Sequence, residues 1–347
     1  MSPRSKSSGS ISFAARVPNW LGDAVLALPA VRALAECSRR GRLVALASSS
    51  SREIFSRVPG IVPLGIAKPG GSIVDSMRTA LIGGSILRSA RPVLVLSFTC
   101  SLTSALMCFL GRVPRRIGFD RGAGSRLYTD RVAWPELPRE HLIDTYCRLV
   151  ESIGVPVSSR VPSLDAAAED VSQGEAVASG HGLAPGKFIC LFPGARYGPS
   201  KRWPAARFAL LGDAIIDKLG LGVVLMGAGE DLRTCDEVKS RMTKECTVLC
   251  GDLDFRGLVG LLRLAGGVVA NDSGGMHLAA ALGTPTVGLF FSTDPRWTGP
   301  VSPRSAVVCK RIGCSPCFMR RCGRAEECTE SVSVDDALEA LAGVMKA

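Results

Sequence analysis

Short apolar segments alternate with helix-like segments along most of the chain. Each apolar segment ends in glycine, proline or polar residues, which is the pattern of a buried strand followed by a turn. The strands predicted in this way are residues 11–17, 43–47, 93–97, 188–192, 223–226 and 264–270, with a short one near Val248. Repeated alternation of strand and helix predicts an α/β protein with parallel sheets.

The two halves of the chain begin alike, with a strand, a loop containing proline and glycine, and a helix. In the first half, the turn 18–23 leads into a helix that Pro29 is expected to kink or restart. In the second half, residues 188–192, 193–202 and 203–219 repeat this order. Two such halves facing each other would place a cleft at the carboxyl ends of both sheets.

The length of 347 residues and the 46% of hydrophobic residues are enough for two domains with their own cores. Residues 155–170 are rich in proline, serine and alanine and form the predicted linker. We therefore expect a first domain at residues 11–160 and a second at 161–330. A serine-rich, basic tail at 1–10 is expected to be disordered, and residues 331–347 to form a final helix.

Residues 268–283, VVANDSGGMHLAAALG, predict a buried strand that runs through a polar turn into a helix. Residues 271–273 are of helix-capping types, and two glycines follow. The backbone N–H groups of Ser273 and Gly274 at the positive helix end would suit a phosphate, and His277 could point back over the same anion. On the local pattern alone, an ordinary capped helix with a packed histidine is the more common explanation.

The chain is basic, with 42 Lys and Arg against 31 Asp and Glu and a net charge of +11. This charge suggests an anionic partner such as a nucleotide, a phosphorylated lipid or a membrane surface, although it could serve solubility alone. Aromatic residues make up only 5%, so binding of single-stranded nucleic acid by stacking is poorly supported. Residues 111–131 are predicted to form an ordered basic loop, with Arg115, Arg116, Arg121 and Arg126 as candidate contacts to an acidic partner; the alternative is a basic loop that is only solvated.

Two segments are candidates for a signal peptide or a membrane span, and neither has the required pattern. Residues 1–10 lack the apolar core of a signal peptide, which predicts a cytoplasmic protein. Residues 93–110 carry no charge, but their serines and threonines divide them into a strand, a turn and a helix from about Leu102, so we reject a membrane span. Most of the thirteen cysteines, such as Cys108 and Cys190, are interpreted as small buried hydrophobes in a reducing compartment.

Several cofactor motifs are absent from the sequence. Gly227-Ala228-Gly229 is not followed by the third glycine of a dinucleotide-binding fingerprint, and no Walker A loop occurs. No Asp-x-Asp pair was found after a strand in the way that metal-dependent nucleotide-sugar enzymes use one. Phosphate charge is therefore expected to meet Lys201, histidine and helix ends instead of a metal.

Three motifs carry a family resemblance. PNWLGDAVLALPAVRAL (residues 18–34), PGARYGPSKRWP (193–204) and NDSGGMHLAAALGTPTVGLFFSTDP (271–295) resemble, in order and spacing, the ADP-heptose:lipopolysaccharide heptosyltransferases of glycosyltransferase family 9. The Pro-x-Trp-x-Gly-Asp opening and the Gly-Pro-x-Lys-Arg-Trp loop look most like the heptosyltransferase II branch, which adds the second heptose to the inner core. The resemblance implies a GT-B fold, with two Rossmann-like domains facing across a cleft. The acceptor would bind the N-terminal domain and ADP-heptose the C-terminal one.

The resemblance also implies roles for individual residues. Asp23 matches the proposed general base that takes the proton from the acceptor hydroxyl during inverting attack; its alternative role is a helix cap. Lys201 matches the lysine that meets the donor phosphates, and its alternative is a solvated loop lysine. The remaining donor-binding candidates are Asp231 for the ribose, Leu253 for the adenine, Asp272 for the heptose or adjoining phosphate, and Ser273, Gly274 and His277 for the diphosphate.

Four cysteines near the C-terminus form a separate cluster in the sequence. The spacing of Cys314, Cys317, Cys322 and Cys328 could hold a structural zinc, or the four could be free or paired thiols. No metal is expected to be required for catalysis. The final helix at 334–345 is expected to cross back onto the first domain, as GT-B chains often do.

The resemblance thus implies an inverting, metal-independent heptosyltransferase. We expect it to act on a phosphorylated lipid A-core acceptor, with peripheral contact to the inner membrane face and no nucleic acid partner. The alternatives are another member of the family that adds the first or third heptose or a different sugar, and a non-catalytic nucleotide-sugar-binding protein.

Overall fold

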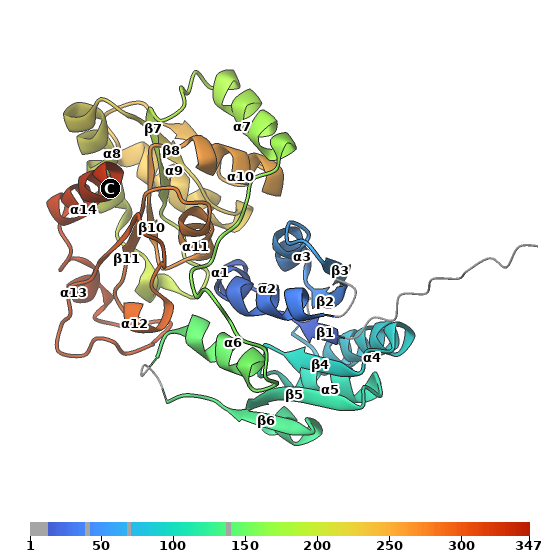
Figure 1. Ribbon diagram of the computed structural model, residues 1–347. Helices are drawn as coiled ribbons and strands as arrows, with labels where there is room; N and C mark the ends of the chain where they lie inside the picture. The colour runs from blue at the N-terminus through green and yellow to red at the C-terminus, as the bar shows by residue number, and fades with distance from the viewer. Residues whose placement is uncertain (1–12, 39–41, 68–70, 137–139) are drawn as a thin grey trace, which may run out of the picture. The chain divides into compact units, whose positions relative to one another are not determined.

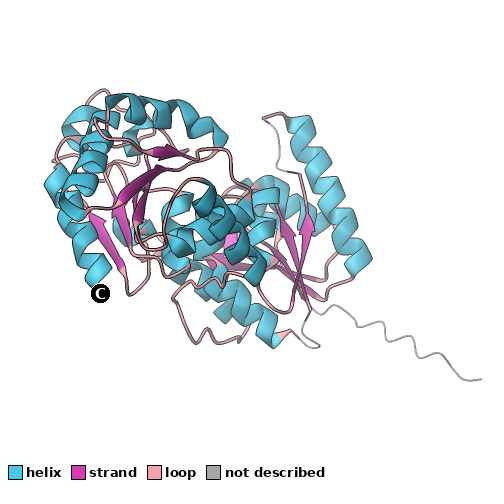
Figure 2. Cartoon of the chain, turned by 90° about the horizontal axis from the view of Figure 1, so that it is seen from above, coloured by secondary structure: helices cyan, strands magenta, loops and turns pink. Residues whose placement is uncertain are grey.

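The chain folds into two compact units. The computed structural model describes residues 13–38, 42–67, 71–136 and 140–347, so the tail predicted at residues 1–10 lies outside the described part. The first unit comprises Met1–Glu136 and Ile143–Arg160, and the second comprises Leu137–Leu142 and Val161–Ala347. Within each unit, helices cover the faces of one twisted sheet (Figures 1 and 2).

The first unit contains a six-stranded parallel sheet with the order β3-β2-β1-β4-β5-β6. The central strands β1 and β4 are buried along their length, apart from the partly exposed first residue of β1. Its strands are β1 (Phe13–Arg16), β2 (Leu43–Ala47), β3 (Ile61–Gly65), β4 (Leu94–Ser97), β5 (Arg115–Asp120) and β6 (Asp130–Ala133). Because the chain builds outward on both sides of the β1–β4 pair, the strand order reverses there, and ligands of such sheets bind at this point.

Helices connect these strands. The restart predicted at Pro29 is confirmed, since one helix ends at Leu26 and the next begins at Leu28 with proline as its second residue. The helices are α1 (Leu21–Leu26), α2 (Leu28–Cys37), α3 (Ser49–Phe55), α4 (Ile73–Ala90), α5 (Leu102–Leu110) and α6 (Leu142–Glu151). Helix α4 packs closely on α5, because a Cβ on Gly83 would lie only 2.4 Å from the sulfur of Met107.

The second unit repeats this architecture with the strand order β12-β11-β10-β7-β8-β9, again all parallel. Its strands are β7 (Phe188–Phe192), β8 (Gly222–Leu225), β9 (Thr247–Val248), β10 (Gly267–Asn271), β11 (Thr286–Leu289) and β12 (Ser305–Val308). Strands β7, β10 and β11 are buried at every residue. The order reverses between β7 and β10, so the loops that follow these two strands lie next to each other at one edge of the sheet.

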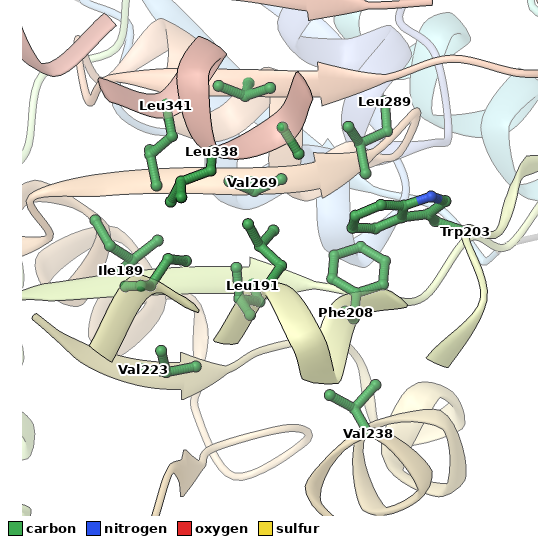
Figure 3. Close-up of a cluster of buried hydrophobic side chains, with 14 of the residues drawn as sticks. Ile189, Leu191, Trp203, Phe208, Val223, Val238, Val269, Leu289, Leu338 and Leu341 are labelled. Carbon is green, nitrogen blue, oxygen red and sulfur yellow. The ribbon is translucent and has the colours of Figure 1, made fainter. Parts of the chain in front are cut away.

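A large hydrophobic cluster of the second unit lies between its sheet and three of its helices, α8, α9 and α14. The helices of this unit are α7 (Ala168–Gly180), α8 (Ala205–Leu219), α9 (Leu232–Arg241), α10 (Phe255–Leu264), α11 (Gly274–Ala281), α12 (Pro295–Thr298), α13 (Ala325–Thr329) and α14 (Val334–Lys346). Alternate residues of β7, such as Ile189 and Leu191, pack against α8, α9 and α14 (Figure 3). The rings of Trp203 and Phe208 meet edge to face with centroids 5.2 Å apart.

Helix α14 belongs to the second unit. Its residues Leu338 and Leu341 lie in the core beside Val269, and Lys218 of α8 pairs with Asp335. The expectation that this helix packs back on the first domain stays a prediction from the sequence. Its apolar face is already used within the second unit, and burial of that face supplies most of the stability of such a helix.

Several elements were not predicted from the sequence. The strands and helices predicted from the sequence do not include strand β3 or the helices α4, α7 and α10. Helices α7 and α10 pack so closely that a Cβ on Gly174 would lie 2.3 Å from the carbonyl carbon of Gly260. Glycines at this contact lower the helix propensity that sequence analysis relies on, although the close packing requires them.

The predicted basic loop at 111–131 is also corrected. Its middle is strand β5, and its end enters β6. Within β5 only Ile117–Phe119 is buried, so the buried run of this strand is too short to stand out among the arginines. Within the described residues, no helix is both long and apolar enough to cross a bilayer.

Candidate functional site

The carboxyl edge of the second sheet gathers most of the predicted donor-binding residues. Lys201 lies in the loop after β7, Asp231 after β8, and Leu253 after β9. Asp272 and Ser273 follow β10 directly. Because all strands are parallel, these loops emerge at the same edge, and the Lys201 loop meets the β10–α11 turn at the point where the strand order reverses.

Lys201 and Asp272 form the centre of this edge. The Lys201 ammonium lies 2.5 Å from Oδ2 of Asp272, and both side chains are nearly buried, with 12% and 5% exposed. The same carboxylate oxygen accepts a hydrogen bond of 2.7 Å from the Thr293 hydroxyl, which follows β11. The solvated-loop alternative for Lys201 is therefore wrong in this structure, since the ammonium is oriented by a buried partner.

Asn271 joins the two loops through its side chain. This fully buried amide donates to the carbonyl of Pro193 at 2.8 Å and accepts from the backbone N–H of Trp203 at 3.1 Å. It therefore holds both ends of the segment that carries Lys201. Asn271 was interpreted from the sequence as a capping residue, and its partners, 78 and 68 residues away, could not be inferred from local pattern.

Ser273 and Gly274 begin helix α11. Ser273 is the N-cap residue, with extended backbone, but its hydroxyl makes no capping bond. The Ser273 Oγ atom is buried and has no hydrogen-bond partner in the described part of the chain. A buried hydroxyl without a partner costs free energy. Beside the N–H groups of the first helical turn, this arrangement fits a phosphate oxygen.

His277 lies in the first turn of α11 and is 5% exposed. Burial lowers the pKa of its imidazole to about 4, opposed by the Asp272 carboxylate and reinforced by His141 and Lys201. His277 is thus neutral near pH 7 and can donate or accept a hydrogen bond without adding charge. His141, whose Nε2 lies 3.0 Å from the carbonyl oxygen of Gly299, was not predicted as part of this group.

Asp231 lies beside the glycines that follow β7 and β8. One oxygen of its carboxylate accepts from the backbone N–H of Ala228 at 3.2 Å. A Cβ on Gly194 would lie 2.2 Å from the same carboxylate, so glycine is required for this approach. Burial raises the pKa of Asp231 above its usual value. Leu253 is half-buried in the turn before α10.

Contrary to the prediction that no such pair follows a strand, an Asp-x-Asp sequence occurs at Asp252-Leu253-Asp254, after β9. Asp254 caps α10 by accepting from Gly257 N–H at 2.8 Å, and it also accepts from Gln173 at 2.9 Å. Across the described ranges, no group of three or more His, Cys, Asp or Glu side chains is arranged to hold a metal ion. The zinc alternative for Cys314, Cys317, Cys322 and Cys328 therefore stays a hypothesis from their spacing.

The first unit places Asp23 at the corresponding edge of its own sheet. Asp23 is the third residue of α1, half-buried, one turn after the end of β1. Its carboxylate lies within electrostatic reach of Tyr146 in α6, where burial first and Asp23 second raise the pKa of the phenol. The N-cap position belongs to Trp20, so Asp23 is not the N-cap residue, although its charge suits the first turn of the helix.

A buried arginine supports the loop between β1 and α1. Arg16, 2% exposed, donates to Oδ1 of Asn19 at 2.7 Å and to the carbonyls of Val17 and Leu46. Burial lowers the pKa of Arg16 to about 10, which leaves it charged at pH 7. No motif pointed to Arg16 in the sequence.

The four predicted acceptor arginines have different environments. Arg115 pairs with Asp130 at 3.1 Å, and Arg116 donates to the carbonyls of Val113 and Leu127. Arg121 lies 4.7 Å from the centre of the Trp134 ring, and Arg126 is exposed. Arg116 is thus mainly a structural residue, whereas Arg121 and Arg126 are exposed residues.

Comparison with known proteins decides the family. The sequence model described as Glycosyltransferase family 9 (heptosyltransferase) matches residues 86–327. The chain belongs to glycosyltransferase family 9. It is thus a glycosyltransferase, and the matched range contains Lys201, Asp272, Ser273 and His277.

Individual relatives of this glycosyltransferase agree. It is 29% identical over 311 residues to lipopolysaccharide heptosyltransferase 2 of Salmonella typhimurium, covering 84% of this chain and 86% of the relative. Among solved structures it resembles Escherichia coli ADP-heptose lps heptosyltransferase II, with a TM-score of 0.78 and 23% identity over 97% of this chain and 99% of that one. A family 9 glycosyltransferase from Veillonella parvula gives a TM-score of 0.83 at 21% identity, covering 97% of each chain. The GT-B fold class predicted from the sequence is confirmed.

Proposed function

We propose that this glycosyltransferase moves L-glycero-D-manno-heptose from ADP-heptose to the first heptose of the lipopolysaccharide inner core. One observation carries the proposal. Lys201, paired with the buried Asp272, lies at the same sheet edge as the Ser273 hydroxyl, which has no hydrogen-bond partner among the described residues. A cation, a hydroxyl and helix N–H groups are the donors that a nucleotide diphosphate requires. The family membership and the relatives named heptosyltransferase 2 support the choice of sugar and acceptor.

In the proposed reaction, the Asp23 carboxylate takes the proton of the acceptor hydroxyl as its oxygen attacks the anomeric carbon. The bond from this carbon to the phosphate oxygen breaks on the opposite face, so the configuration inverts and ADP leaves. Lys201, Ser273 and the α11 N-terminus offset the negative charge that develops on ADP. Neutral His277 supports the same phosphate. The chain's own groups thus take the role that a metal ion has in other transferases.

Asp231 and Leu253 are proposed to contact the ribose and the adenine, because they follow β8 and β9, the two strands that come after β7 in the sheet, and lie at the same sheet edge. Asp272 keeps Lys201 oriented and lies against the heptose or its phosphate. Arg121 and Arg126 are proposed as contacts to acceptor phosphates, with Arg115 and Arg116 less available.

The proposal is tested by transfer from ADP-L-glycero-β-D-manno-heptose to core acceptors with no heptose or one heptose, in the presence of EDTA. We expect transfer only to the one-heptose acceptor, resistant to EDTA and lost in Asp23→Ala while ADP still binds. Transfer to the heptose-free acceptor would assign a different step of the series. Tight ADP binding without any transfer would favour the non-catalytic binding protein.

We also propose that the first unit makes peripheral contact with the cytoplasmic membrane face through helix α4. Ile73, Val74 and Leu81 on this helix are 85%, 75% and 55% exposed, which is unusual for large apolar side chains. Exposed Arg78 and Arg88 lie on the same helix. An apolar helix face with adjacent arginines suits the surface of anionic lipids.

Vesicle sedimentation tests this contact. We expect binding to vesicles of phosphatidylglycerol and phosphatidylethanolamine but not of phosphatidylcholine alone, reduced by Leu81→Ser. Leu210→Ser on α8 is the matched control, since Leu210 is 56% exposed in the second unit. Equal loss in both variants, or none in either, would contradict the role of α4.

A further inference from the structure

The segment 317–320 lies directly against the loop that carries Lys201, although more than a hundred residues separate them in sequence. The Tyr197 hydroxyl donates to the carbonyl of Phe318 at 2.5 Å, and the Ser200 hydroxyl donates to the carbonyl of Met319. In return, Nε of Arg320 donates to the carbonyl of Tyr197 at 2.8 Å. Three hydrogen bonds thus connect the two segments.

The segment 317–320 is itself fixed to the sheet edge. The backbone N–H groups of Cys317 and Phe318 both donate to the carbonyl of Ser292, at 3.1 and 2.8 Å. The Ser292 hydroxyl donates to that of Ser200 at 3.1 Å, and the next residue, Thr293, binds Asp272. The segment therefore spans from the partner side of the Lys201–Asp272 pair back to the loop that bears the lysine.

Gly198 marks the closest approach of the two segments. A Cβ at this position would lie 2.3 Å from the carbonyl oxygen of Arg320. The backbone of Gly198 is extended, with φ of 161°, so the need for glycine comes from proximity and not from its dihedral angles. Because the neighbour is backbone, a larger residue would push the segments apart.

Tyr197 transmits this contact to the lysine. The Lys201 ammonium lies 4.8 Å from the centre of the Tyr197 ring, and the Arg320 guanidinium lies 5.5 Å from the same ring. Ser200, only 3% exposed, directly precedes Lys201. The lysine is therefore restrained through its neighbour in the chain, the ring beside it and its carboxylate partner.

We propose that residues 317–320 act as a positioning clamp for Lys201, with Tyr197, Ser200 and Arg320 as positioning residues. The proposal rests on the proposed function of Lys201 at the donor diphosphate. A lysine side chain and a surface loop both lose conformational freedom when they are held in one geometry. If the clamp imposes this order before the donor arrives, binding does not have to supply it.

A double-mutant cycle on the full chain tests the clamp. Gly198→Ala is made in the wild type and in Lys201→Ala, and ADP affinity is measured by calorimetry. We expect Gly198→Ala to weaken ADP binding about tenfold in the wild type and less than twofold in the Lys201→Ala background, since the effect passes through the lysine. Gly323→Ala in the same region is the matched control, because a Cβ there meets nothing within 4 Å.

An equal loss of ADP affinity in both backgrounds would overturn the clamp, since the glycine would then act independently of Lys201. Hydrogen exchange gives a second readout that needs no ligand. The N–H groups of Lys201 and Arg202 bond within the loop, and their protection should fall in Gly198→Ala and in Tyr197→Phe. Unchanged protection would also overturn it. Reduced protection together with a Lys201→Ala variant that binds ADP normally would uphold the clamp and refute the proposed role of Lys201.

Discussion

The two sheets present their candidate groups on different supports. In the first unit, Asp23 lies on helix α1, which begins a few residues after β1. The short connection between them is held by buried Arg16, which donates a hydrogen bond to Asn19. In the second unit, Lys201 lies in a longer loop held from several directions, by Asn271, by Asp272 and by the segment 317–320. The difference suggests that the carboxylate depends on local structure, whereas the lysine depends on contacts distant in sequence.

This contrast predicts different consequences of substitution. A change at Asp23 should affect one chemical step and little else. A change around Lys201 should alter donor affinity, stability and pH response together, because the same side chains serve the site and the packing.

Asp23→Asn should have the largest effect. The amide keeps the size of the side chain but cannot act as a base toward the hydroxyl of the acceptor sugar, so we expect kcat to fall about a thousandfold. ADP affinity, measured by calorimetry, should stay within twofold of wild type. A loss of ADP affinity in Asp23→Asn as large as the loss of kcat would contradict the separation of Asp23 from the ADP-binding residues.

The stability of the second unit should depend on pH through His277. Its folded pKa of about 4 lies below the unfolded value of about 6.5, so the unfolded state binds more protons between these values. The contribution of His277 to the free energy of unfolding is therefore fully present above pH 6.5. It is lost as the pH drops through this window, which lowers the free energy of unfolding by up to about 3 kcal/mol. Urea unfolding of wild type and His277→Gln from pH 7.5 to 4.5 isolates this contribution. Parallel curves for the two proteins would contradict it.

Asn271→Ala should destabilise the second unit by about 2 kcal/mol, because it leaves the buried carbonyl of Pro193 and the N–H of Trp203 without a side-chain partner. Thermal unfolding followed by calorimetry measures this loss. Asn19→Ala is the counterpart in the first unit, and it should cost less, since Arg16 keeps its bonds to backbone carbonyls. A larger loss of stability in Asn19→Ala than in Asn271→Ala would contradict the view that the loop with Lys201 depends more on contacts distant in sequence than the loop after β1.

Arg115→Ala should have the smallest effect on stability, about 0.5 kcal/mol or less, because its pair with Asp130 is about half exposed. Arg116→Ala should cost more, since its guanidinium donates to two backbone carbonyls. Chemical unfolding of both variants gives the comparison. Equal values would remove the structural distinction drawn between these neighbours.

The sequence predicted the regular parts of the fold well, and it did so for a physical reason. Strands such as β7 and β2 are continuous apolar runs that must be buried on both faces, so local composition identifies them. Strand β5 could not be identified from local composition, because two arginines occupy its start and only a short run of its residues is buried.

The candidate site was predicted unevenly. Motif resemblance selected Lys201, Asp272 and Ser273, but it could not reveal that Thr293 shares the Asp272 carboxylate. Nor could it reveal the contacts of Tyr197 and Ser200 with residues 317–320, which lie about 120 residues away. Such pairings follow from the tertiary fold, and no local pattern encodes them.

The buried Lys201–Asp272 pair has one more consequence. Before a donor arrives, the lysine's positive charge is already balanced by its carboxylate, and neutral His277 adds none. A nucleotide diphosphate therefore meets, at this pair, a cation that already has a counter-charge, together with oriented hydrogen-bond donors. Its affinity should consequently fall less steeply with ionic strength than the net charge of +11 alone would suggest.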